Sequence, residues 1–159
     1  MTSRATFLLL RIAVAACFIG HGAFGVIGKS DWLPYFALFG IGEAPAWMLM
    51  PVIGWIVIAV GVLALVRPTW AVFAWAAVWA TWTAALRPLA GEGVFEMLER
   101  AGNYGVPIAI LLWAGRPRSV QAAFARMPAP PLDARARLLL HRALVATTVV
   151  LLVGHAGLG

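Results

Sequence analysis

The sequence predicts an all-α fold, a polytopic bundle of membrane helices, from three observations. The 159 residues are 63% hydrophobic and only 11% charged, whereas a soluble domain is close to half apolar and about a quarter charged. The mean hydropathy is +0.91. The apolar residues fall into runs of about 20, the length that a helix needs to cross a bilayer. These runs leave no room for a soluble domain, so residues 1–159 are expected to form one integral membrane domain.

Five runs are expected to be transmembrane spans. They cover residues 6–27, 44–66, 70–86, 93–114 and 138–157. The third run is the shortest and can extend through Arg87 if that side chain reaches the interface or points inward. Arg11 interrupts the first run, unlike the apolar core of a cleaved signal peptide, so this run is also expected to be a span.

Aromatic residues between the first two spans predict a short helix at the membrane interface. Ser30 and Asp31 suit its N-cap. The residues expected to share one face of this helix are Trp32, Tyr35, Phe36 and Phe39.

Charge asymmetry predicts the orientation of the spans. With the N-terminus in the cytoplasm, nine of the twelve basic residues lie on the inner side: Arg4, Arg11, Arg67, Arg116, Arg118, Arg126, Arg135, Arg137 and Arg142. Among the six acidic residues, Asp133 alone lies on that side. We therefore expect a multi-pass inner-membrane protein with its C-terminus in the periplasm. The net charge of +6 then indicates topology and contact with the lipid bilayer, not binding to nucleic acid.

Two histidines beside glycines are expected near the outer ends of their spans. His21 lies in the first span and His155 in the fifth, and both spans run outward. Two neutral imidazoles from neighbouring helices are the axial ligands that a b-type haem needs, and adjacent glycines would let a flat ring approach the backbone. The alternatives are another ligand-binding or proton-handling role for at least one histidine, and close helix packing.

The outer half of the fourth span is polar. Its polar residues recur at helical spacing and are expected to share one face: Glu92, Glu96, Glu99, Arg100 and Asn103. Such a face must point into the bundle or a wet cavity, because each charge facing lipid costs at least about 2.5 kcal/mol. Glu96 and Arg100, four residues apart, can neutralise each other. The alternative is an exposed outer helix, with the span beginning near Tyr104.

The third span carries a stripe of tryptophans at positions 75, 79 and 82. A stripe in mid-span indicates either helix packing or contact with a quinone or porphyrin. Arg87 follows the stripe and is well placed to pair with Glu92, Glu96 or Glu43. The single cysteine, Cys17, excludes an internal disulfide, a CxxC redox pair and a thiolate metal cluster.

Several of these motifs together resemble the DoxX-like family of small bacterial integral membrane proteins, over roughly residues 6–115. The resemblance rests on an Arg followed by Gly-His-Gly in the first span, Pro51-Val52-Ile53-Gly54, the Arg-Pro-Leu-Ala-Gly run at 87–91, and Glu-Arg-Ala-Gly-Asn-Tyr-Gly-Val-Pro at 99–107. It implies a four-helix core, with the fifth span an addition. It also implies an association with redox chemistry, since some relatives are membrane subunits of quinone-reducing oxidoreductases. The family pattern touches Arg11, His21, Arg87, Glu99, Arg100 and Asn103.

We therefore expect a polar pocket in the outer half of the bundle, built from His21, Arg87, Glu96, Glu99, Arg100, Asn103 and His155. The leading hypothesis is a redox-associated membrane subunit or small oxidoreductase that binds quinone or haem b there. His21 and His155 would be metal ligands only for haem. The alternatives are a non-catalytic accessory subunit of a larger membrane complex and a small-solute carrier. The expected partners are lipids, other membrane subunits or a second copy of the chain.

Overall fold

The computed structural model describes residues 2–159, and over these residues the chain is helical without any β-strand. Four long helices dominate the fold: α1 (Ser3–Ile27), α3 (Glu43–Val66), α4 (Trp70–Leu89) and α8 (Ala134–Ala156). Two shorter ones, α5 (Val94–Glu99) and α6 (Ala101–Ala114), follow each other closely. The prediction of an all-α fold is confirmed.

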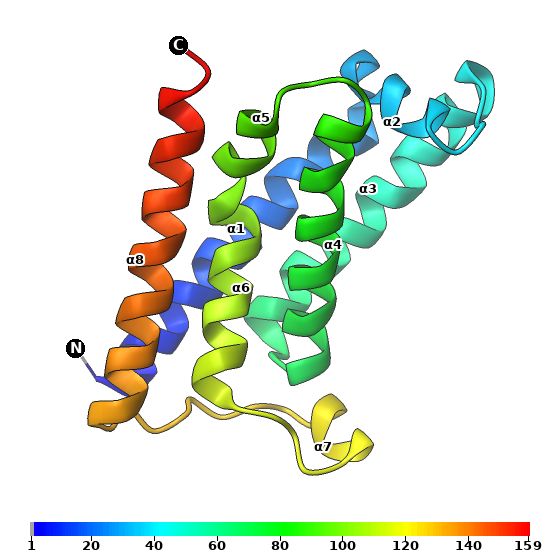
Figure 1. Cartoon of the computed structure of the whole chain (residues 1–159). Coiled ribbons are helices and arrows are strands. Elements are labelled where there is room, and N and C mark those ends of the chain that lie inside the picture. Colours follow the sequence, from blue (N-terminus) through cyan, green and yellow to red (C-terminus); the bar gives the residue numbers. More distant parts are fainter. Residues whose placement is uncertain (1) are drawn as a thin grey trace.

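Small elements connect the long helices. The 3-10 turn η1 (Ser30–Trp32) and helix α2 (Leu33–Ala37) join α1 to α3, and α7 (Val120–Phe124) lies between α6 and α8. Figure 1 shows α2 beside the start of α3 and the C-terminus at the same end of the bundle, with α7 at the opposite end. The short helix predicted after the first span is therefore present, although no side chain caps η1.

Three of the long helices, α1, α3 and α8, are long and apolar enough to cross a membrane. Helix α4 has 20 residues, but its tryptophans, threonines and Arg87 lower its mean hydropathy. Helix α6 is apolar and has 14 residues. Length and composition thus support the predicted membrane location.

The single helix expected over residues 93–114 is instead two helices, α5 and α6, separated at Arg100. Arg100 has φ −83° and ψ 8°, a conformation that leaves the regular helical ladder. The backbone at the break lies against α8, where Gly154 has no side chain to collide with Glu99. The polar residues are consequently divided between the loop before α5, α5 itself and the start of α6.

Three large aromatic side chains of the core pack together where α1 begins. Phe7 packs edge-on against Phe73 and Trp113, with ring centroids 6.2 and 6.0 Å apart. Arg11 also lies in this half, where its Nε donates to the carbonyl of Ala64 at 2.9 Å. A buried aromatic cluster therefore lies at the end of the bundle opposite α2.

Helices α1 and α3 approach backbone to backbone at Gly22 and Gly54. A Cβ atom built at Gly22 lies 2.6 Å from the carbonyl oxygen of Gly54. Since both contacting groups are backbone, neither can move aside without separating the helices.

Replacing Gly22 with alanine is expected to destabilise the protein by about 1–3 kcal/mol, the usual range for overpacking. Gly20→Ala is the matched control, because nothing lies within 4 Å of a Cβ atom there. Thermal unfolding in detergent measures both variants. Equal losses of stability would contradict the backbone contact.

Candidate ligand-binding cavity

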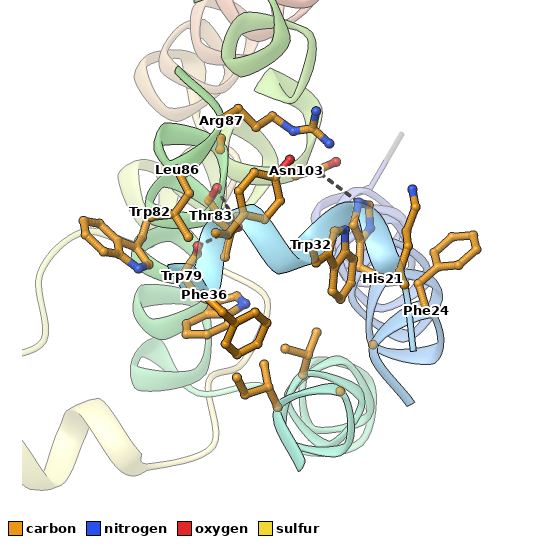
Figure 2. A pocket seen from close by; sticks show the side chains of 18 of the residues that line it. His21, Phe24, Trp32, Phe36, Trp79, Trp82, Thr83, Leu86, Arg87 and Asn103 are labelled. Atoms are coloured by element: carbon orange, nitrogen blue, oxygen red, sulfur yellow. Dashed lines mark hydrogen bonds between the residues drawn. The ribbon is translucent and has the colours of Figure 1, made fainter. Parts of the chain in front are cut away.

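A cavity of about 330 Å³ lies between α1, α3 and α4, at the end of the bundle that holds the C-terminus. The connection from α1 to α3 lies across it, and we call residues 29–41 the cover segment. Figure 2 shows side chains from α1, α2 and α4 converging on this space. The cavity exists because five segments of the chain meet here: α1, the cover segment, α3, α4 and the start of α6.

Most of the cavity wall is apolar and aromatic. Helix α3 contributes Leu49, Ile53 and Val57. The aromatic lining residues come from α1, the cover segment and α4: Phe24, Trp32, Tyr35, Phe36, Phe39, Trp79 and Trp82. A wall of this kind favours a flat, largely apolar ligand.

The tryptophan stripe of α4 is divided between packing and the cavity. Trp79 and Trp82 line the cavity, whereas Trp75 does not. Trp75 stacks on Trp79 with centroids 5.2 Å apart and an interplanar angle of 9°. Trp75 therefore packs inside the bundle and supports the ring of Trp79, while Trp79 and Trp82 border the cavity, and contact of these rings with a quinone or porphyrin stays a prediction.

His21 and Asn103 form a polar pair at the cavity. The Nδ1 atom of His21 lies 2.9 Å from the carbonyl oxygen of Cys17, and because a carbonyl only accepts, Nδ1 carries the proton. The unprotonated Nε2 then accepts a hydrogen bond from Asn103 Nδ2 at 3.5 Å. This long bond, drawn in Figure 2, leaves a ligand room to compete for the same atoms.

Arg100 also lines the cavity and is incompletely paired. Its Nε lies 3.8 Å from a carboxylate oxygen of Glu99, beyond hydrogen-bond distance. Among the described residues, no group bonds this buried Nε. The expected pair between Glu96 and Arg100 does not form, because the break at Arg100 turns the two side chains to different partners. Arg100 thus retains donor capacity beside His21.

Arg87 links three segments around the cavity. Its Nη1 donates to Glu92 Oε2 at 2.6 Å and to Glu96 Oε2 at 3.0 Å. The predicted pairing with Glu92 and Glu96 is confirmed. Glu43 instead accepts from Trp47 Nε1 at 3.3 Å. In addition, Tyr35 donates to Glu92, so the network ties the cover segment to α4 and α5.

The phenol of Tyr35 is held in its neutral form by this network. Burial, and then the hydrogen bond to Glu92, raise the pKa of Tyr35 to about 12. The ordinary value is near 10, so the folded state binds this proton more tightly. The resulting stabilisation is present below pH 10 and is lost as the pH rises from about 10 through about 12.

A phenolate absorbance titration is expected to show this shift as a difference between wild type and Tyr35→Phe. The difference should contain one ionisation near pH 12, with none near pH 10. An ionisation near pH 10 would show that the phenol is free in water and does not hold the cover segment.

The structure brings together only part of the expected site. His21, Arg87, Arg100 and Asn103 line the cavity. Glu96 and Glu99 do not line the cavity. Each forms an ion pair with an arginine that does, Glu96 with Arg87 and Glu99 with Arg100.

His155 lies elsewhere, exposed on α8, which packs against α5 and α6. The two imidazoles that were expected to share a haem are therefore not brought together. Nor does any group of three or more His, Cys, Asp or Glu suited to a metal ion occur in residues 2–159.

Sequence reasoning did not assign the aromatic cover to the site. Trp32, Tyr35, Phe36 and Phe39 were expected at the membrane interface, yet all four line the cavity. Their helical spacing was a signal for a shared face, but it did not indicate which surface that face would cover. Leu49, Ile53 and Val57 carried no signal at all, since an apolar span looks the same beside lipid and beside a cavity.

Comparisons with protein-family models, curated proteins and solved structures find no match to this chain.

Proposed function

We propose that this protein binds a quinone in the cavity, as a redox-associated integral membrane protein. The observation that carries the proposal is a cavity with aromatic walls and one polar end. Its volume of about 330 Å³ is at the lower end of the range for small-molecule sites, about 300–1,000 Å³. A quinone ring has the matching form, with flat apolar faces and polar atoms at its edge.

The polar end suits both redox states of such a ligand. The amide of Asn103 and the guanidinium of Arg100 are donors for a quinone carbonyl oxygen. The Nε2 atom of His21 is an acceptor for a hydroquinone hydroxyl, and it can receive the proton of that hydroxyl as a general base. Donors and an acceptor side by side are what a ligand that gains and loses protons requires.

The cavity opens between the cover segment and α4, and we expect a ligand to enter there from the membrane. Phe39 and Trp82 line the cavity, yet their side chains are 55% and 44% exposed. Their ring centroids are 6.0 Å apart. In a bilayer this exposed flank lies toward the acyl chains, which favours a membrane-borne ligand with an apolar tail over a water-soluble solute.

Quinone is favoured over haem b by the histidines. His21 lines the cavity and offers one imidazole nitrogen, Nε2, to a ligand. His155, the intended second axial ligand, is exposed on α8. A hydrogen-bonded quinone needs one imidazole, whereas the expected haem needed two.

We propose five spans, formed by α1, α3, α4, the α5–α6 pair and α8, with a DoxX-like core of four and α8 as the addition. Three of these five, α1, α3 and α8, are long and apolar enough to cross a membrane, and α4 and the α5–α6 pair, which pack against each other, complete the proposed five. The nine arginines assigned to the cytoplasm support an N-terminus inside the bacterial inner membrane and a C-terminus in the periplasm.

A role as a subunit of a larger membrane complex is the second candidate. Only 6% of the apolar membrane-spanning stretch of α8 is buried against the rest of the chain. Val145, Val149 and Leu152 are exposed along this helix. Such a face is available to lipid, to another membrane subunit or to a second copy of the chain.

The quinone proposal is tested by filling the cavity from one position. Thr83 lines the cavity, and Thr83→Phe would place a ring inside it. Thr81→Phe is the matched control, since both threonines bond a carbonyl of their own helix and Thr81 lies outside the cavity. Each variant in lipid nanodiscs is titrated with a short-chain ubiquinone, and binding is followed by quenching of tryptophan fluorescence.

Wild type and Thr81→Phe are expected to bind, and Thr83→Phe is expected to lose at least about tenfold in affinity. A tenfold change corresponds to about 1.4 kcal/mol, a modest loss for a blocked cavity. Wild type that neither binds this probe nor carries quinone in its lipid extract would overturn the proposal. A Soret band in the purified protein would favour haem, and solute uptake blocked by Thr83→Phe would favour the carrier.

A further inference from the structure

The short helix α7 presents an apolar pair at the end of the bundle opposite the cavity. Val120 and Phe124 are one helical turn apart and therefore share a face. Their side chains are 73% and 63% exposed. Ser119 caps the helix, its Oγ accepting from the backbone N–H of Ala122 at 3.1 Å. The two side chains therefore form a small apolar face outside the bundle.

The exposure of this pair is imposed by fixed contacts on both sides of α7. The backbone N–H of Met127 donates to the carbonyl of Pro68 at 2.8 Å. Thr69 and Arg126 form an antiparallel bridge, and Trp70 Nε1 donates to the carbonyl of Gly115 at 3.0 Å. These bonds hold α7 beside the turn between α3 and α4, so Val120 and Phe124 cannot fold back into the bundle.

Positive charge surrounds the pair. Arg116, Arg118 and Arg126 are exposed, and the sequence from 115 to 132 contains no acidic residue. None of the ion pairs found in residues 2–159 involves these arginines. Apolar side chains flanked by arginines are the pattern of a segment that lies in an anionic lipid surface.

We propose that α7 and its three arginines form a binding site for anionic phospholipid. Val120 and Phe124 enter the boundary between headgroups and acyl chains, and Arg116, Arg118 and Arg126 contact the phosphates. Figure 1 shows α7 beyond the turn between α3 and α4, at the end of the bundle opposite the C-terminus. The site is remote from the cavity and does not depend on the identity of the cavity ligand.

The first test measures lipid selectivity. The protein in detergent micelles is titrated with phosphatidylglycerol or with phosphatidylcholine, and the unfolding temperature is recorded with native mass spectra that count retained lipids. Wild type is expected to retain and be stabilised by phosphatidylglycerol. The triple variant Arg116→Gln/Arg118→Gln/Arg126→Gln is expected to lose most of that effect.

The matched control removes three arginines from the same end of the bundle but outside α7, as Arg4→Gln/Arg135→Gln/Arg142→Gln. It should keep most of the phosphatidylglycerol effect. Equal losses in the two triple variants would show that the stabilisation by phosphatidylglycerol depends only on net charge, and would overturn the site at α7. Equal stabilisation of wild type by the two lipids would also overturn it.

The second test measures insertion of the apolar pair. In a Cys17→Ser background, Phe124→Cys and Gln121→Cys are each labelled with bimane and reconstituted into vesicles of phosphatidylcholine and phosphatidylglycerol. The label at 124 is expected to be quenched by nitroxide-labelled lipids and shielded from aqueous iodide. The label at 121 should be more open to iodide. Equal iodide access at both positions would place the face in water and overturn the proposal.

Discussion

Replacing His21 with leucine is expected to weaken quinone binding about tenfold. The variant removes the acceptor Nε2 and leaves the amide of Asn103 facing an apolar side chain. A lost hydrogen bond together with an unpaired polar group costs about 1.4 kcal/mol or more, which corresponds to a factor of ten in Kd. Titration of nanodisc-embedded protein with a short-chain ubiquinone measures the change.

His155→Leu provides the matched control for this experiment. The substitution is chemically identical, and His155 is exposed on α8 outside the cavity. Its Kd should equal that of wild type. If His155→Leu weakens binding as much as His21→Leu, the ligand does not bind in the cavity described here.

The pairing of His21 with Asn103 can be examined separately. Asn103→Leu alone should also weaken binding, and the double variant His21→Leu/Asn103→Leu should lose less than the sum of the two single losses. Groups that bond each other and one ligand are coupled in this way. Strict additivity would mean that the two side chains act independently.

Replacing Arg87 with methionine is expected to cause the largest loss of stability, about 2–4 kcal/mol. The side chain of Arg87 is only 16% exposed, and its removal leaves Glu92 and Glu96 close together without a cation. Charge-assisted hydrogen bonds contribute about 1.5–3 kcal/mol each, and breaking a fully buried pair costs about 3–5 kcal/mol. The two carboxylates are 32% and 30% exposed. The expected loss of stability is therefore smaller than for a fully buried pair.

Thermal unfolding in detergent measures this loss, and two further variants interpret it. Arg87→Met/Glu92→Gln/Glu96→Gln should recover much of the stability, because it removes the unpaired charges as well as the arginine. Lys29→Met breaks the exposed pair with Asp31, in which the side chains are 40% and 72% exposed. Exposed pairs contribute about 0–1 kcal/mol, so this control should be nearly neutral.

Arg87→Met should also loosen the cover segment, because Glu92 connects Arg87 to Tyr35. Limited proteolysis is expected to cut within residues 29–41 faster than in wild type. Loss of stability without faster cleavage there would mean that the network supports α4 and α5 but does not hold the cover.

The helical runs were predictable because periodicity and length are local properties of the chain. The first, second, third and fifth expected spans correspond to α1, α3, α4 and α8 within a few residues at each end. The fifth begins early, at Ala134, because Asp133 caps it by accepting from the backbone N–H of Ala136 at 2.8 Å. The fourth was not predictable as two helices, since the break at Arg100 depends on how α8 packs against it.

The chemistry of the site was partly predictable for a similar reason. His21, Arg87, Arg100 and Asn103 attracted attention because polar side chains are costly in apolar helices and need partners. The sequence assigned those partners only in part: it predicted the pairing of Arg87 with Glu92 and Glu96, but it also paired Glu96 with Arg100. Glu96 pairs with Arg87 instead of Arg100, a choice that depends on the meeting of α4 with α5.

The sequence by itself determined that this protein is helical, strongly apolar and polar at a few positions, since these properties follow from residue type and spacing. Only the tertiary structure decided which polar residues share a cavity. It placed His21 beside Asn103, brought the aromatic cover segment over both, and left His155 outside on α8. The physical reason is that a helix face has no fixed partner until the helices pack. Lipid, a neighbouring helix and a cavity all accept the same apolar side chains.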